Sequence, residues 1–84
     1  MVSPDQVEAM IKVEIPDAQV QVLTSDGEHY EVIVVSPVFE GKRLVQQHQL
    51  VYNAIQTEML SGAIHAMAVK TYTPQAWESS KQAV

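Results

Sequence analysis

Residues 64–77 have the sequence IHAMAVKTYTPQAW, which predicts a strand that leads directly into a helix. The β-branched and aromatic residues before Thr73 favour the strand. Thr73 suits the N-cap of the helix because its hydroxyl can accept an orphan backbone N–H, and Pro74 suits the first helical position, where its missing donor costs nothing. We expect Tyr72 and Trp77 to pack against each other and to fix the angle between the strand and the helix.

One histidine, His65, lies in this predicted strand. Side chains alternate between the two faces of a strand, so His65 should share a face with Met67 and Val69. A histidine among apolar neighbours is either a buried residue with a hydrogen-bond partner or a ligand held for a metal. The residues of this stretch leave both roles open.

Two other segments have the periodicity of amphipathic helices. The first begins at Ser3, which can form a capping box with Gln6, and it should end at about Glu14, before a proline. The second spans residues 42–60, where apolar side chains recur on one arc at about 100° per residue. One helix, or two helices with a bend near Leu50, would satisfy this longer pattern.

A β-hairpin lies between these two helical segments. Residues 19–23 alternate polar and apolar side chains, as in a strand with one solvent-facing side. Residues 29–35 return as a more apolar strand, and a turn with Asp26-Gly27 at its tip joins the two. We expect the second strand to be central in its sheet and Phe39, in the loop that follows, to fill the core.

The order of elements is therefore helix, strand, strand, helix or helix pair, strand, helix. A strand that follows a hairpin through a helical crossover should lie parallel to its partner. We expect an α+β fold with a three-stranded mixed sheet and helices packed on one face. One domain should span residues 1–84, and the last helix should fray from Lys81 onward.

The chain has 84 residues, a net charge of −5 and no cysteine. Without cysteine, any sulfur ligand to a metal must come from a partner. No apolar run approaches the roughly 20 residues that span a bilayer, and the N-terminus lacks the features of a signal peptide, so we expect a soluble cytoplasmic protein without a membrane partner. The glycines are too far apart for a phosphate-binding loop and the serines lie at turns, so we do not expect an enzyme.

Three histidines are the candidates for chemistry. His48 falls within the apolar arc of residues 42–60, so we expect a core residue that is hydrogen-bonded to a neighbour. His29 and His65 begin the second and third strands. If these strands are parallel neighbours, both histidines lie at the same edge of the fold. Two imidazoles there could bind a metal but could not complete a tetrahedral site.

The sequence resembles the BolA family along nearly its whole length. Each matching segment alone is modestly specific, but their order and spacing together make the resemblance strong. The segments are DGEHY at residues 26–30, VSPVFEGK at 35–42, VQQHQLVY at 45–52, IHAMAVK at 64–70 and TPQAW at 73–77. The resemblance implies an αββααβα fold similar to the class II KH domain, which agrees with the order of elements above.

The resemblance also implies a partner and a cofactor. BolA-like proteins bind monothiol glutaredoxins and share a [2Fe–2S] cluster with them, in cluster trafficking or in iron and redox sensing. The glutaredoxin and glutathione supply thiolates, and the BolA-like chain supplies a histidine that corresponds to His65. Members supply a second ligand, Cys or His, from the loop between the first two strands. Asp26 stands where many members carry Cys, and His29 is the nearest histidine, so either residue is a candidate second ligand.

Two other functions stay open. KH-like domains bind single-stranded nucleic acids and some BolA-like proteins are described as transcriptional regulators, so a nucleic-acid-binding regulator is the alternative. The KH domain clamps the backbone with a Gly-X-X-Gly loop, which this sequence lacks, and only Lys42, Arg43 and Lys70 offer local positive charge. A structural adaptor that docks on glutaredoxin without metal is a third function. We expect the free protein to be a monomer or a weak homodimer.

Overall fold

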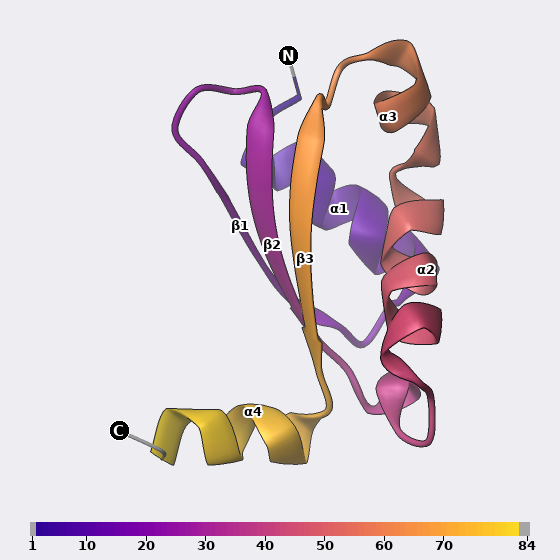
Figure 1. The fold of residues 1–84 in the computed structure, drawn as a ribbon, viewed down its shortest axis with the longest axis vertical. Coiled ribbons are helices and arrows are strands. Elements are labelled where there is room, and N and C mark those ends of the chain that lie inside the picture. The colour runs from indigo at the N-terminus through magenta and orange to yellow at the C-terminus, as the bar shows by residue number, and fades with distance from the viewer. Residues whose placement is uncertain (1, 83–84) are drawn as a thin grey trace.

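The computed structural model of the protein describes residues 2–82, which form a three-stranded sheet, four α-helices and one short 3-10 helix (Figure 1). The fold is α+β with the order αββααβα, as the sequence predicts. In chain order the elements are α1 (Pro4–Glu14), β1 (Gln19–Thr24), β2 (His29–Val35), the 3-10 helix η1 (Pro37–Phe39), α2 (Leu44–Ala54), α3 (Gln56–Ser61), β3 (Ala66–Tyr72) and α4 (Pro74–Gln82).

β2 is the central strand of the sheet. It pairs antiparallel with β1, where Gln19 lies opposite Val35, and parallel with β3, where His29 lies opposite Ala66. The predicted mixed sheet with a central second strand is thus confirmed. Because parallel strands start at the same edge of a sheet, the N-terminal ends of β2 and β3 lie side by side.

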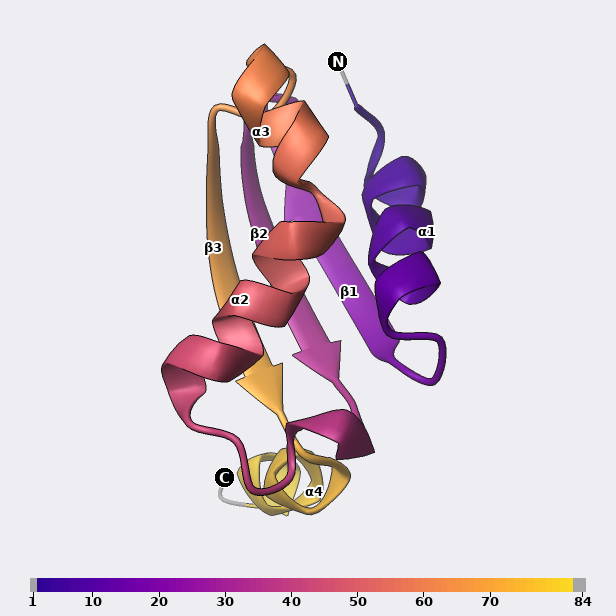
Figure 2. The ribbon, with the colours of Figure 1, turned by 90° about the vertical axis from the view of Figure 1, so that its right-hand side faces the viewer.

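Three helices cover one face of the sheet (Figure 2). α1 packs against β1, and α2 packs against both α1 and β3. α4 follows β3 around the end of the sheet and extends toward the other face (Figure 1). No helix of residues 2–82 covers that other face along its length, and Leu23 on it is 58% exposed. We call it the open face.

The core lies between the sheet and the three covering helices. β2 alternates in burial, so that Tyr30, Val32 and Val34 face the core while His29 and Glu31 face solvent. The largest fully buried side chains come from α1, β2, η1, α2, the residue between α2 and α3, and the loop before β3. They are Phe39, Ile11, Ile55, Ile64, Val7, Val32, Val34 and Val51.

The predicted helix starts are confirmed at both ends of the chain. The Ser3 hydroxyl accepts a hydrogen bond from the Gln6 amide at 3.1 Å, and the Ser3 amide donates to Gln6 Oε1 at 2.9 Å. These two bonds form the capping box and satisfy orphan backbone donors. At α4, the Ala76 amide donates to the Thr73 hydroxyl at 3.2 Å.

The aromatic staple beside α4 is also confirmed. The rings of Tyr72 and Trp77 lie 5.2 Å apart between centroids, tilted by 55°. This is a favourable aromatic geometry, and it holds α4 at its angle to β3. The predicted fraying from Lys81 is wrong for Lys81 and Gln82, which belong to α4, and its remainder lies outside the described residues.

The helical segment predicted at residues 42–60 differs from its prediction in three ways. It begins at Leu44, because Arg43 is extended and acts as the N-cap. It is two helices, as one alternative predicts, but they meet at Ile55 rather than near Leu50. His48 is only partly buried, so its assignment to the core is wrong.

Gln47, rather than His48, makes hydrogen bonds between α2 and its neighbours. Gln47 Oε1 accepts a hydrogen bond from the Thr71 hydroxyl at 2.6 Å, and Gln47 Nε2 donates to the carbonyls of Phe39 at 3.3 Å and Lys42 at 2.9 Å. One side chain therefore joins α2 to β3 and to the loop before α2. Partly buried polar groups need hydrogen-bond partners, and Gln47 is the partner of the Thr71 hydroxyl.

We predict that Phe39→Ala lowers the free energy of unfolding by about 3–5 kcal/mol, because it empties a site that is 1% exposed. Urea unfolding followed by circular dichroism would measure the change. Val38→Ala is the matched control, since Val38 is adjacent to Phe39 in η1 but is 42% exposed, and its effect should stay within about 0.5 kcal/mol. Similar losses in the two variants would show that η1 does not anchor the core.

Candidate metal-ligand site at the start of β2 and β3

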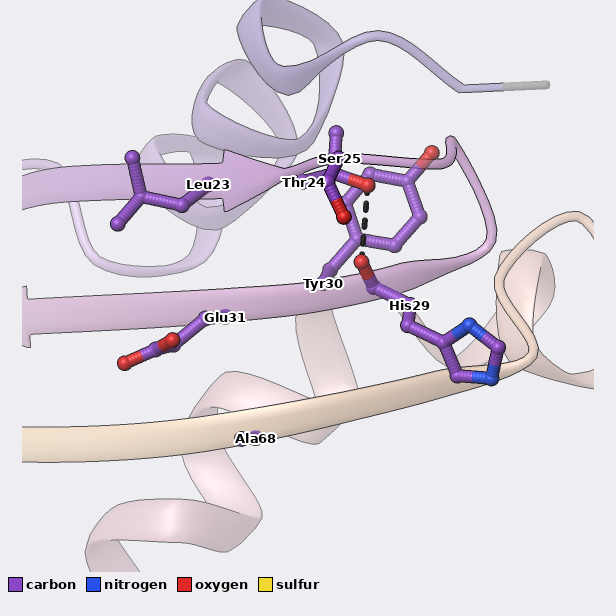
Figure 3. A pocket seen from close by; sticks show the side chains of 7 residues that line it. All are labelled: Leu23, Thr24, Ser25, His29, Tyr30, Glu31 and Ala68. Atoms are coloured by element: carbon purple, nitrogen blue, oxygen red, sulfur yellow. Dashed lines mark hydrogen bonds between the residues drawn. The ribbon is translucent and has the colours of Figure 1, made fainter.

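The Thr24 side chain and the backbone of Gly27 shape the loop between β1 and β2. The Thr24 hydroxyl donates to the His29 carbonyl at 2.8 Å, a bond drawn in Figure 3, and accepts from the Gly27 amide at 3.0 Å. Gly27 has a φ of 75°, which only glycine adopts without strain. The predicted turn tip at Asp26-Gly27 is thereby confirmed, and His29 is the first residue of β2 after this loop.

Asp26 makes three hydrogen bonds within this loop. Its Oδ1 accepts from the backbone amides of Glu28 and His29, each at 2.9 Å, and its Oδ2 lies 2.8 Å from Nδ1 of the His29 ring. An aspartate that accepts amides two and three residues ahead forms an Asx-type turn. Both carboxylate oxygens of Asp26 are therefore engaged inside the protein.

These contacts shift the protonation of both residues. The backbone hydrogen bonds from His29 and Glu28, together with the His29 ring, hold the pKa of the Asp26 carboxyl well below its usual range. The hydrogen bond to Asp26, with the negative charges of Asp26 and Glu28, raises the pKa of His29 above its usual value. Asp26 is thus a carboxylate at neutral pH, and it favours a proton on Nδ1 of His29.

His29 is exposed at the rim of a shallow hollow on the open face. Its side chain is 64% exposed, and its ring extends from the start of β2 toward the start of β3 (Figure 3). The hollow has a volume of about 450 Å³, and its other lining residues are Leu23, Thr24, Ser25, Tyr30, Glu31 and Ala68. A ligand or partner on the open face can therefore reach His29.

His65 lies one residue before β3 rather than within it. The amides of His65 and Ala66 both donate to the carbonyl of Glu28, at 3.0 and 3.3 Å. Two amides on one carbonyl resemble a β-bulge, which re-aims the side chains beside it. Ile64 is accordingly 1% exposed, while the side chain of His65 is 55% exposed. The expectation that His65 shares a face with Met67 is wrong, because the alternation starts only at Ala66.

Glu28 connects the two candidate ligands. It precedes His29 in the chain, its carbonyl accepts from the His65 amide, and its Oε2 lies 4.0 Å from His65 Nδ1. The pairing of β2 with β3 thus brings His29 and His65 to the same edge of the sheet, as the parallel arrangement predicts. Both imidazoles are exposed there.

The side chains at this edge offer some of the ligand atoms that a metal site needs, but not a complete set. Asp26, Glu28 and His29 can each offer one ligand atom within 4.8 Å of the others. Asp26 already uses both oxygens for hydrogen bonds, one of them to Nδ1 of His29, so His29 offers its Nε2 as a nitrogen ligand and His65 offers its ring. Two imidazoles on a chain without cysteine cannot complete the ligand set of an iron–sulfur cluster, so a cluster held at this edge would need its remaining ligands from a partner.

The basic residues do not gather on one surface. Lys42 and Arg43 belong to the segment that joins η1 to α2, and this segment runs on the side of the covering helices (Figure 2). Lys70 is on the open face of β3, where its Nζ lies 3.8 Å from Glu31 Oε1. The structure therefore divides the three residues proposed for nucleic-acid binding between two sides of the sheet.

A family model described as BolA-like protein matches residues 7–76 of the chain. The protein belongs to the BolA-like family. The matched range contains His29, His65 and the loop of Asp26, and the resemblance inferred from the sequence is confirmed. No helix within residues 2–82 has the length and apolar character needed to cross a membrane.

Individual relatives support the same family. Protein BOLA2 of Arabidopsis thaliana is 38% identical over 86 aligned residues, covering 98% of this chain and 90% of the relative. A DNA-binding transcriptional regulator BolA of Escherichia coli is 38% identical over 56 residues, covering 67% of this chain and 52% of the relative. The structure of a BolA protein homologue from Coxiella burnetii has a TM-score of 0.73 at 38% identity, covering 93% of this chain and 99% of that one.

The sequence identifies Asp26 only as a turn residue or an alternative ligand. Its bond to His29 is visible in the sequence as an Asp three residues before a His, with a glycine between them. That spacing is the available signal, since an Asx turn brings the side chain of its first residue toward the residues two and three positions ahead. Glu28 carries no comparable signal, because its contact with His65 depends on the pairing of β2 with β3.

We predict that Asp26→Asn lowers the pKa of His29, measured as the titration midpoint of its ring proton in NMR spectra. The raised pKa means that the pair stabilises the loop fully below the ordinary pKa of histidine and loses this contribution as the pH rises through the raised value. Glu31→Gln is the control, because it removes the same charge from a carboxylate that pairs with Lys70. Equal shifts in both variants would mean that net charge, not the hydrogen bond, controls His29.

Proposed function

We propose that this BolA-like protein binds a monothiol glutaredoxin and shares a [2Fe–2S] cluster with it, in cluster trafficking or in iron and redox sensing. The observation that carries the proposal is the pair of exposed imidazoles, His29 and His65, at one edge of a chain that has no cysteine. The glutaredoxin and glutathione would supply the thiolates. The open face beside His29 leaves room for the partner to approach.

The protein's contribution would be two nitrogen ligands in place of thiolates. Exchanging thiolate for neutral imidazole on one iron reduces the negative charge of the cluster and raises its reduction potential. Such a cluster is suited to transfer or to sensing. His65 is the first candidate ligand and His29 the second, since Asp26 is occupied by its own hydrogen bonds.

We also propose that the role is not enzymatic and that the protein acts in the cytoplasm. The exposed edge holds ligand-type side chains rather than an activated nucleophile with its base. The free chain would be a monomer or a weak homodimer, and the heterodimer with glutaredoxin would be the functional form.

We predict that mixing the protein with a monothiol glutaredoxin that carries a [2Fe–2S] cluster and glutathione gives a heterodimer with a changed visible absorption and circular dichroism spectrum. His65→Ala should abolish the change, because it removes the first nitrogen ligand, and His29→Ala should weaken or alter it. Size-exclusion chromatography would show the heterodimer.

His48→Ala is the matched control for these variants, since it removes a partly exposed imidazole on α2, away from the β2–β3 edge. It should leave the spectrum unchanged. A heterodimer whose spectrum does not differ from that of glutaredoxin alone would contradict cluster sharing and favour the adaptor without metal. A full spectral change with His65→Ala would exclude His65 as a ligand.

A second candidate function is nucleic-acid binding in transcription regulation. It is favoured by the similarity to a relative described as a DNA-binding transcriptional regulator. Lys42 and Arg43, next to each other before α2, would then contact phosphates, with Lys70 on the other side of the sheet. The separation of these residues makes this the weaker candidate, because affinity grows with the number of phosphates that one surface neutralises.

We predict that any binding to single- or double-stranded DNA is weak and non-specific at about 0.15 M salt, where electrostatic screening is strong. Fluorescence anisotropy at several salt concentrations would measure it. Sequence-specific binding that Lys42→Ala and Arg43→Ala weaken, while Lys81→Ala does not, would establish the regulator instead.

A further inference from the structure

We infer that Asp26 is a positioning residue, which holds the His29 ring with its proton on Nδ1 and leaves Nε2 as the atom that binds the metal. The inference rests on the proposed function and goes further, because it names the ligating atom and the residue that selects it. It also resolves the choice between Asp26 and His29 as second ligand.

The geometry of the loop supports this assignment. Asp26 Oδ2 is 2.8 Å from His29 Nδ1, while Asp26 Oδ1 is fixed by two backbone amides at 2.9 Å each. A carboxylate can only accept hydrogen bonds, so the nitrogen that faces it must be the protonated one. In the neutral ring the lone pair is then on Nε2, on the side of the ring away from Asp26.

The arrangement matches a common feature of metal sites. Histidines that bind metals usually donate their other ring N–H to a carboxylate or a carbonyl, which fixes the tautomer and the ring orientation and raises the basicity of the ligating nitrogen. Here the Asp26 carboxylate is itself held by hydrogen bonds from the backbone amides of Glu28 and His29. The His29 ring is thus oriented by the loop, while its side chain remains 64% exposed toward the open face.

The neighbouring carboxylates do not take this role. Glu28 Oε2 lies 4.0 Å from His65 Nδ1, beyond hydrogen-bonding distance, and Glu31 pairs with Lys70. Among the hydrogen bonds of residues 2–82, the His29 ring has Asp26 as its partner. A carboxylate therefore selects the Nδ1–H tautomer of His29, whereas Glu28 is too far from His65 to select a tautomer there.

Asp26→Asn is the informative variant. The asparagine keeps an oxygen that can accept the amides of Glu28 and His29, so the loop can retain its turn. The new NH₂ group in place of Oδ2 is a donor, which requires a lone pair on Nδ1 and moves the ring proton to Nε2. The variant is nearly isosteric, yet it reverses the tautomer and blocks the proposed ligating atom.

The first measurement uses the free 84-residue chain. Long-range ¹H–¹⁵N NMR spectra, recorded at a pH above the pKa of His29, distinguish the two tautomers. We expect the Nδ1–H form in the unsubstituted protein and the Nε2–H form in Asp26→Asn. Glu31→Gln, which removes one carboxylate from the same hollow, should leave the tautomer unchanged.

The second measurement uses the complex with a cluster-loaded monothiol glutaredoxin. Asp26→Asn should weaken formation of the spectrally changed heterodimer by about 10- to 100-fold, the usual cost of removing such a partner. Glu31→Gln should have little effect, and the amide shifts of Glu28 and His29 report whether the turn is retained.

The outcomes separate this inference from the proposed function. An Nε2–H tautomer in the unsubstituted protein overturns the inference without any variant. A spectrally changed heterodimer that Asp26→Asn forms as well as the unsubstituted protein also overturns it, while cluster sharing stands. The absence of any spectral change with the unsubstituted protein overturns the proposed function, whatever the tautomer.

Discussion

The parallel pairing of β2 with β3 is the constraint on which the candidate site depends. It places the first residues of both strands at one edge, with His29 opposite Ala66 and the amide of His65 on the carbonyl of Glu28. The two histidines are far apart in the sequence, and only this long-range ladder of backbone hydrogen bonds brings them together. The fold thereby exposes two imidazoles at one edge of the sheet, outside the core.

The rest of the structure supports that ladder from the covered face. β3 is an outer strand, and α2 fastens it through polar contacts as well as apolar ones. The Tyr52 hydroxyl donates to the carbonyl of Met67 at 3.0 Å, and Gln47 accepts from Thr71. These bonds satisfy groups of an outer strand that would otherwise need water, and they fix the depth at which α2 packs. The open face is left free of such contacts along most of its length.

The candidate site combines nitrogen donors with several carboxylates. Asp26 raises the basicity of one imidazole through a direct hydrogen bond, and Glu28 adds negative charge nearby. Imidazole ligands raise the reduction potential of an iron–sulfur cluster, whereas nearby negative charge lowers it. In the proposed complex, the distance from the cluster to each carboxylate would set the balance between these two effects. A partner with positive charge around its own ligands would complement this edge.

The sequence by itself determined the elements whose signals are local. The pairs Ser3–Gln6, Thr73–Ala76 and Tyr72–Trp77 act over a few residues, so the helix starts follow from hydrogen bonds and contacts within one turn. The alternation of residues 19–23, the Asp26-Gly27 turn and the more apolar run at residues 29–35 predicted the hairpin and its central strand. The tertiary structure alone decided that Ile64 is buried while His65 is exposed, since a shared carbonyl of Glu28 sets that reversal. It also decided that His48 lies outside the core, because packing against β3 at that level depends on Gln47, and a periodic pattern cannot show which neighbour a helix meets.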